Sequence, residues 1–229
     1  MTNVLASKLI AYFVAFAAAV TPVFVLADGD NILRGVVTVF DTNGNRLADR
    51  SNVVVFIDGI SKVPGPNKDS QAPRISHKDA LFAPRVLPIT RGGVVDFFND
   101  DDIYHNVFSL SKTKPFDLGI YPQGTTKLVT FDRAGLVKLY CNIHPDMVAN
   151  ILVLNNNHFA VTNADGEFKI AGLPDIQITL RAWHESGEAK PQQISMSGES
   201  ILERNIEIRL TGRSAPHKNK FGKDYSKKY

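Results

Sequence analysis

The chain contains one cysteine, and a histidine and a methionine follow it at three-residue steps. They are Cys141, His144 and Met147, in the stretch LYCNIHPDMVANILVL. A thiolate and a thioether favour Cu(I) and an imidazole suits Cu(II), so these side chains could hold a copper ion that changes its oxidation state. A single cysteine cannot form an internal disulfide, so Cys141 is an intermolecular bridge, an inert buried thiol or a metal ligand.

A blue-copper centre needs a second imidazole from elsewhere in the chain. His105 is the natural candidate, because it follows the apolar run GVVDFF and the polar stretch NDDD, well upstream of the cysteine. Asn106 comes directly after it and could tie this segment to the cysteine loop by hydrogen bonds. Zinc is the alternative metal for Cys and His, but Met is a poor zinc ligand. The sequence contains no H-x-H pair of the kind that multicopper oxidases use.

Other candidate side chains are expected to have no part in a metal site. His77, His158, His184 and His217 are interpreted as surface or structural histidines. Asp96, in the run GVVDFF that precedes His105, is expected to organise a loop rather than to bind a metal.

Short β-branched runs separated by turn residues must position these side chains. The runs that predict strands are Gly35–Phe40, Val53–Asp58, Arg85–Thr90, Gly93–Phe98, Thr126–Phe131, Leu136–Cys141 and Ala149–Leu154. The later stretches QITLRAW and NIEIRL alternate apolar and polar residues, which is typical of strands with one buried face. No long amphipathic helix is indicated, so the sequence predicts an all-β fold with two sandwich units. The candidate ligand loop would join two strands of one hairpin.

The segments HNVFS and YCNIHPDM together resemble the type 1 copper cupredoxins. The C-x2-H-x2-M spacing, with Pro145 after the histidine, is similar to the short ligand loop of amicyanins. Plastocyanins share a tyrosine directly before the cysteine, as Tyr140 stands here. The resemblance covers roughly Ala72 to Asn155 and implies a cupredoxin Greek-key β-sandwich with one type 1 copper ion.

The resemblance also implies roles for particular residues. The edge of His144 would be the electron port, and Tyr140 a second route. Asp146 stands where amicyanins have an apolar residue, so it would place a negative charge beside the port, and Asn99–Asp102 would add more. The implied metal ligands are His105, Cys141 and His144 in the equatorial plane and Met147 in the axial position.

The C-terminal half contains a second resemblance. AVTNADGEFKIAGLPDIQITLRAWHE is similar to the carboxypeptidase regulatory-like domain, a small transthyretin-like β-sandwich. The usual opening of that domain resembles Leu33–Gly59, far upstream of its continuation at His158–Leu210. Two arrangements remain open. The copper domain is inserted into the regulatory-like domain, or the first two strands belong to the cupredoxin sheet.

The two ends of the sequence suggest a leader and a tail. An apolar run after Lys8 and small residues before Asp28 predict a signal peptide, with an uncleaved membrane anchor as the alternative. Arg213–Tyr229 holds six Lys and Arg against Asp224 alone, and we expect a disordered basic arm. The predicted division is residues 1–27 signal peptide, 28–62 N-terminal strands, 72–155 copper domain, 156–212 regulatory-like domain and 213–229 tail.

These features favour a periplasmic blue-copper protein that transfers electrons between redox partners of the dehydrogenase or cytochrome c type. It would not be an enzyme, because no catalytic dyad and no open metal site are found in the sequence. No nucleic-acid partner and no stable membrane insertion after cleavage are expected. The amicyanin-like loop suggests a methylamine-utilisation-like system by analogy alone. The alternative is a copper carrier, or a docking subunit of a periplasmic dehydrogenase complex.

Overall fold

A computed structural model of the chain describes residues 31–60, 71–197, 200–212 and 217–225. The described residues form eighteen β-strands and no helix. The prediction of an all-β fold is therefore confirmed. No helix in these ranges is long and apolar enough to cross a membrane. The predicted signal peptide, residues 1–27, lies outside the described residues.

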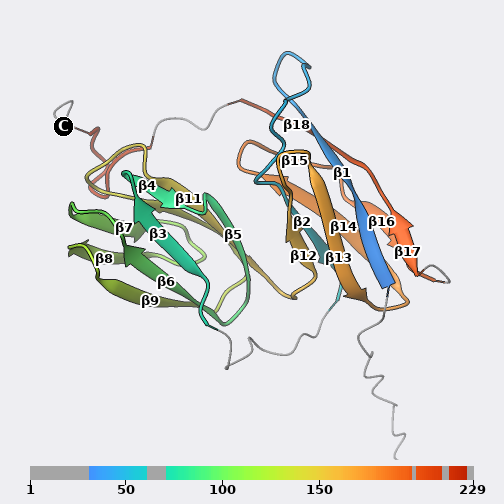
Figure 1. The fold of residues 1–229 in the computed structure, drawn as a ribbon, viewed down its shortest axis with the longest axis horizontal. Coiled ribbons are helices and arrows are strands. Elements are labelled where there is room, and N and C mark those ends of the chain that lie inside the picture. Colours follow the sequence, from blue (N-terminus) through green and yellow to red (C-terminus); the bar gives the residue numbers. More distant parts are fainter. Residues whose placement is uncertain (1–30, 61–70, 198–199, 213–216, 226–229) are drawn as a thin grey trace, which may run out of the picture.

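Nine strands from the middle of the sequence build one sandwich, drawn in green and yellow in Figure 1. One sheet has the order β5-β11-β10-β7-β8 and the other β4-β3-β6-β9. Side chains from both sheets share one apolar core, so the two sheets pack face to face. The strands are β3 (Arg74–Lys78), β4 (Leu81–Ala83), β5 (Val86–Thr90), β6 (Gly93–Asn99), β7 (His105–Ser109), β8 (Phe116–Tyr121), β9 (Thr126–Phe131), β10 (Gly135–Tyr140) and β11 (Val148–Leu154).

A second sandwich combines the first two strands with the C-terminal ones, so blue β1 lies among orange strands in Figure 1. β1 pairs with β13, β17 and β18, and β2 pairs with β12 and β14. Among the described strands, neither pairs with a strand of residues 71–154, so the chain leaves this sandwich after β2 and returns at β12. The strands are β1 (Asn31–Phe40), β2 (Val54–Asp58), β12 (Phe159–Val161), β13 (Glu167–Leu173), β14 (Gln177–His184), β15 (Gly187–Glu188), β16 (Gln192–Ser195), β17 (Ile201–Glu203) and β18 (Ile206–Arg209).

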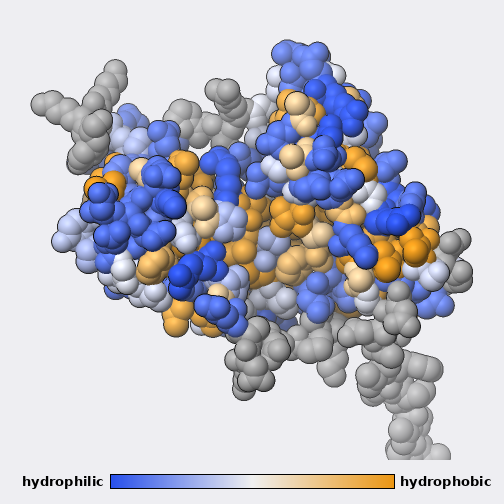
Figure 2. Space-filling model, viewed as in Figure 1, coloured by the Kyte–Doolittle hydropathy of each residue, from blue (hydrophilic) through white to orange (hydrophobic). Residues whose placement is uncertain are grey.

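Alternating side chains on two strands join the sandwiches. In β11, Ile151 and Val153 face the core of the first sandwich, while Leu152 and Leu154 enter a separate cluster with Trp183. β2 does the same from the other side, because its alternate residues lie in the second core and in that shared cluster. On the face shown in Figure 2, apolar residues gather over the middle of the molecule, between the two sandwiches. Burial on both faces explains why the last four residues of β11, ILVL, are all apolar.

The structure contains strands that the sequence pattern did not reveal. The hairpin of β3 and β4 and the strand β8 were not predicted, and neither were the short strands β15, β16 and β17. His105 is the first residue of β7, a strand that was not predicted from the sequence. Its rigid backbone position comes from pairing with Tyr121 of β8. This pairing fixes the position of one candidate ligand.

Candidate metal centre

The loop between β10 and β11 carries three of the four predicted ligands. The two strands pair up to Tyr140 opposite Val148, so residues 141–147 form a closed hairpin loop. The Cys141 N–H donates to the Met147 carbonyl at 3.2 Å, and the Met147 N–H donates to the His144 carbonyl at 3.2 Å. The backbone alone therefore fixes the positions of these three residues relative to one another.

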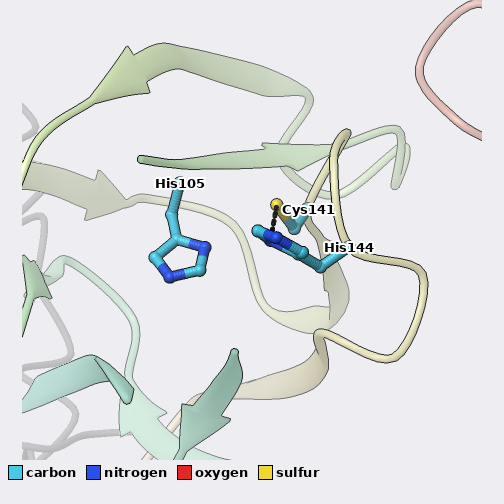
Figure 3. Close-up of side chains that lie close together, drawn as sticks. All are labelled: His105, Cys141 and His144. Carbon is cyan, nitrogen blue, oxygen red and sulfur yellow. Dashed lines mark hydrogen bonds between the residues drawn. The ribbon is translucent and has the colours of Figure 1, made fainter. Parts of the chain in front are cut away.

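The structure brings the first histidine to this loop. One ring nitrogen each of His105 and His144 and the sulfur of Cys141 lie within 4.8 Å of one another. Figure 3 shows one nitrogen of the His105 ring pointing toward the other two side chains. The Cys141 sulfur lies 3.8 Å from Nδ1 of His144. His105 and Cys141 are buried, while His144 is partly exposed. Two imidazoles and one thiol therefore converge on one point.

The His105 ring has one satisfied and one unsatisfied nitrogen. Nε2 lies 2.6 Å from a carboxylate oxygen of Asp101. Nδ1 is buried and has no hydrogen-bond partner among the described residues. Burial alone lowers the pKa of His105, but the Cys141 sulfur and the Asp101 carboxylate raise it above its usual value. A buried nitrogen without a partner is what a metal ligand presents before its metal is bound, so the residues fit a copper ion.

The surroundings of Cys141 favour the thiolate. Burial by itself raises the pKa of this thiol, but the His105 imidazole and backbone N–H groups lower it below the usual value. One of these groups, the N–H of Ile143, lies 3.4 Å from the sulfur. Because the thiolate is the form that binds metals, the loop prepares the sulfur for coordination.

Met147 is fully buried and belongs to the same apolar cluster as Cys141. It closes the loop at the start of β11. Its position in sequence and its burial suit a weak thioether ligand that is shielded from water.

Asn106 joins the strand of His105 to the ligand loop. Its side-chain oxygen accepts the N–H of Asn142 at 3.2 Å. Its side-chain nitrogen donates to Asp117 and to the carbonyl of Gly119. The prediction that Asn106 ties the two segments together is confirmed.

His77 was interpreted as a surface or structural residue, and the structure places it in full burial beside the site. Its ring stands nearly perpendicular to that of His105, with the centroids 5.5 Å apart, and its Nε2 lies 3.1 Å from the hydroxyl of Tyr121. Burial, helped by the nearby His105, lowers the pKa of His77 to about 3. It is therefore a neutral ring that fills the space behind the candidate ligand.

The burial of His77 predicts that the free energy of unfolding of the copper-free chain depends on pH. In the unfolded chain His77 binds a proton with an ordinary pKa near 6.5. The folded chain does not bind that proton until the pH nears 3, so the free energy of unfolding falls as pH drops through this window. One proton contributes a slope of at most about 1.4 kcal/mol per pH unit. Urea unfolding across this range should show a shallower slope for His77→Gln than for the natural chain. Identical slopes would contradict the assignment.

Part of the C-terminal segment is packed against the protein, so the prediction of a disordered arm is wrong for that part. We expected a disordered arm over 213–229, but residues 217–225 pack against the ligand loop, near the end marked C in Figure 1. The His217 ring lies over Tyr140, with the centroids 4.2 Å apart, and its Nε2 lies 2.6 Å from the carbonyl oxygen of Pro145. The Tyr140 face, a predicted second electron route, is thus covered by the chain itself.

Two further contacts hold this segment. The Tyr225 hydroxyl donates to the carbonyl of Cys141 at 2.6 Å. The Lys220 N–H donates to the side chain of Asn142, and its ammonium group pairs with Asp117 at 2.6 Å. Burial raises the pKa of Tyr225 to about 12, so this hydroxyl stays protonated and keeps donating at neutral pH. Polar contacts and ring stacking hold a segment that has no apolar periodicity.

The remaining candidates lie away from the ligand atoms. Asp96 pairs with Arg74 across β6 and β3 at 2.7 Å. His158 and His184 belong to the second sandwich. The expectation that these residues are not metal ligands agrees with their positions.

Comparisons with known proteins give a partial picture. No protein-family model matches the sequence, and no curated protein is similar to it. Among solved structures, a purple cupredoxin from Nitrosopumilus maritimus is similar at 26% identity and a TM-score of 0.33, over 36% of this chain and 99% of that one. A copper-containing nitrite reductase from Thermus scotoductus is similar at 25% identity and 0.36, over 41% of this chain and 24% of that one.

A reduced Cu(I) form of an amicyanin mutant is similar at 17% identity and a TM-score of 0.35, over 44% of this chain and 98% of that one. All three matches cover less than half of the chain, at TM-scores below 0.5. The case for a copper centre therefore depends on the residues described above.

Proposed function

We propose that the chain binds one copper ion in a type 1 site and transfers single electrons. The proposal depends on one observation, the convergence of the Cys141 sulfur and a nitrogen from each of two histidines within 4.8 Å. His105, Cys141 and His144 would hold the copper ion through two ring nitrogens and a thiolate, and Met147 would add its thioether as a weak ligand. This donor set is the one that distinguishes blue-copper electron-transfer sites.

Copper would supply a one-electron couple, Cu(II)/Cu(I), and the chain's own residues would make that couple fast. The closed hairpin loop and β7 hold the donor atoms together without the metal, so little has to rearrange between oxidation states. Burial of Cys141 and Met147 excludes water from the sulfur ligands. The proposed role is to carry electrons, and it includes no step in which a substrate is converted.

The exit for the electron is proposed at His144. Its side chain is partly exposed, while the other two atoms of the cluster belong to buried residues. Tyr140, the alternative route, lies under His217. A partner would therefore meet the protein at the edge of the His144 ring, beside exposed Asp146.

The location and partners form part of the same proposal. An exported protein, released after cleavage of residues 1–27, would exchange electrons with dehydrogenases or c-type cytochromes. The second sandwich resembles a carboxypeptidase regulatory-like unit and would serve as a docking or structural module. This role is supported by its separate apolar core.

One experiment separates an electron carrier from a copper carrier. The copper-loaded chain is cycled between ascorbate and ferricyanide in the presence of a Cu(I) chelator, and the copper that remains bound is measured. An electron carrier keeps its copper through repeated cycles. Transfer of copper to the chelator in the reduced state would instead support copper delivery.

The proposed port predicts a local charge effect. In Asp146→Asn, oxidation of the reduced protein by ferricyanide should be a few-fold faster at low ionic strength, because a negative charge beside His144 is removed. The difference should shrink in high salt. Asp175→Asn removes an exposed carboxylate from the second sandwich and serves as the matched control. An equal acceleration in both variants would place the port elsewhere.

A further inference from the structure

We propose that Asp101 is a positioning residue for copper, which orients the His105 ring and lowers the reduction potential of the site through that ring. The inference rests on the proposed copper site and names a residue outside its ligand set. Asp101 and His105 are four positions apart in the sequence.

The contact is short and shielded from water. Oδ2 of Asp101 lies 2.6 Å from Nε2 of His105, and the side chains are 11% and 0% exposed. An ionised carboxylate only accepts hydrogen bonds, so Nε2 carries the proton of the neutral ring. The lone pair is then on Nδ1, the buried nitrogen without a hydrogen-bond partner in the described structure. Asp101 therefore selects the form of His105 that can bind a metal through Nδ1.

The carboxylate is itself held in place by a turn of the neighbouring hairpin. Its two oxygens accept the N–H groups of Asp79 at 2.6 Å and Ala80 at 2.9 Å. The Asp101 N–H donates to the side chain of Asn99. With the His105 contact, the carboxylate has three donors around it. It cannot turn away without leaving two turn N–H groups unpaired.

The turn between β3 and β4 has an uncommon backbone. Asp79 has φ 54° and Ala80 has φ 53°, both in the left-handed region. This conformation costs a residue with a Cβ roughly 1–2 kcal/mol. The two hydrogen bonds from these N–H groups to one carboxylate offset this cost. The observed strain and the convergence of two donors indicate a built site for Asp101 rather than a chance contact.

The negative charge of Asp101 should change the properties of the metal through the His105 ring. A carboxylate that accepts the second N–H of a histidine ligand makes that ligand more basic. A more basic ligand stabilises Cu(II), the more positive state, over Cu(I). The ring of His77, whose centroid lies 5.5 Å from that of His105, is neutral and adds no charge beside this ligand.

The test is the reduction potential of copper-loaded Asp101→Asn, measured by protein voltammetry. We expect the visible band to remain. The potential should rise by the equivalent of a tenfold change in the Cu(II)/Cu(I) ratio, about 59 mV for one electron. Asp102→Asn removes the same charge from the exposed neighbour and should shift the potential far less.

A second measurement needs no variant. In the Cu(I) form, which is diamagnetic, NMR should show a slowly exchanging proton on Nε2 of His105. Equal potentials in Asp101→Asn and Asp102→Asn, or a missing Nε2 proton, would overturn the role of Asp101 while the copper site stands. If the natural chain shows no thiolate–copper band at all, the proposed function fails and this inference fails with it.

Discussion

A Cys141→Ser chain, loaded with Cu(II), is expected to lose its intense visible absorption entirely. That band would come from charge transfer between the Cys141 thiolate and the metal, and a serine hydroxyl cannot supply it. Serine is nearly the same size as cysteine, so the buried loop should still close. The fluorescence of Trp183, the single tryptophan, checks that the second sandwich stays folded.

The matched comparison is Met147→Leu, a buried change of similar volume in the same loop. This variant should keep the band, because the thiolate remains, while the reduction potential shifts with the loss of the axial ligand. A Cys141→Ser protein that stays intensely blue would show that Cys141 is not the copper ligand.

Gly35→Ala is expected to destabilise the second sandwich by about 3 kcal/mol or more. Gly35 lies in β1, where the strand changes partner from β17 to β18. A Cβ there would lie 1.7 Å from the carbonyl oxygen of Arg204, and backbone atoms cannot move aside cheaply. The Arg204 N–H also donates to the carbonyl of Arg34, which fixes this close approach.

Two spectroscopic signals report on the unfolding of the two sandwiches separately. Trp183 lies in β14 of the second sandwich, and the copper band would report the first. Urea should therefore unfold the tryptophan environment of Gly35→Ala earlier than that of the natural chain, while the copper band changes less. Arg34→Ala, an exposed change one residue away, should shift stability within about 0.5 kcal/mol. Equal midpoints for the two variants would contradict the observed interleaving of β1 with the C-terminal strands.

The sequence was sufficient for the parts of the site that depend on local spacing. Cys141, His144 and Met147 belong to one hairpin loop, so their types and intervals carry the information. The strands were predictable where apolar and polar residues alternate, as in β14 and β18. His105 was found because the ligand chemistry requires a second imidazole.

Features that depend on contacts between distant segments were missed. The β3–β4 turn has Asp79 and Ala80 where turn patterns favour asparagine and glycine, because Asp101 binds its N–H groups from another loop. His77 is buried only through its tertiary neighbours. The docked residues 217–225 have a polar composition, and their polar and ring contacts leave no periodic pattern in the sequence.

A Cu(II) titration of the chain, followed by its visible absorption spectrum, tests the proposed type 1 copper site. We expect an intense thiolate-to-copper band that grows linearly and saturates at one copper per chain. A colourless protein, or a weak band that does not saturate at one equivalent, would mean that Cys141 and the two histidines do not form a trigonal copper site.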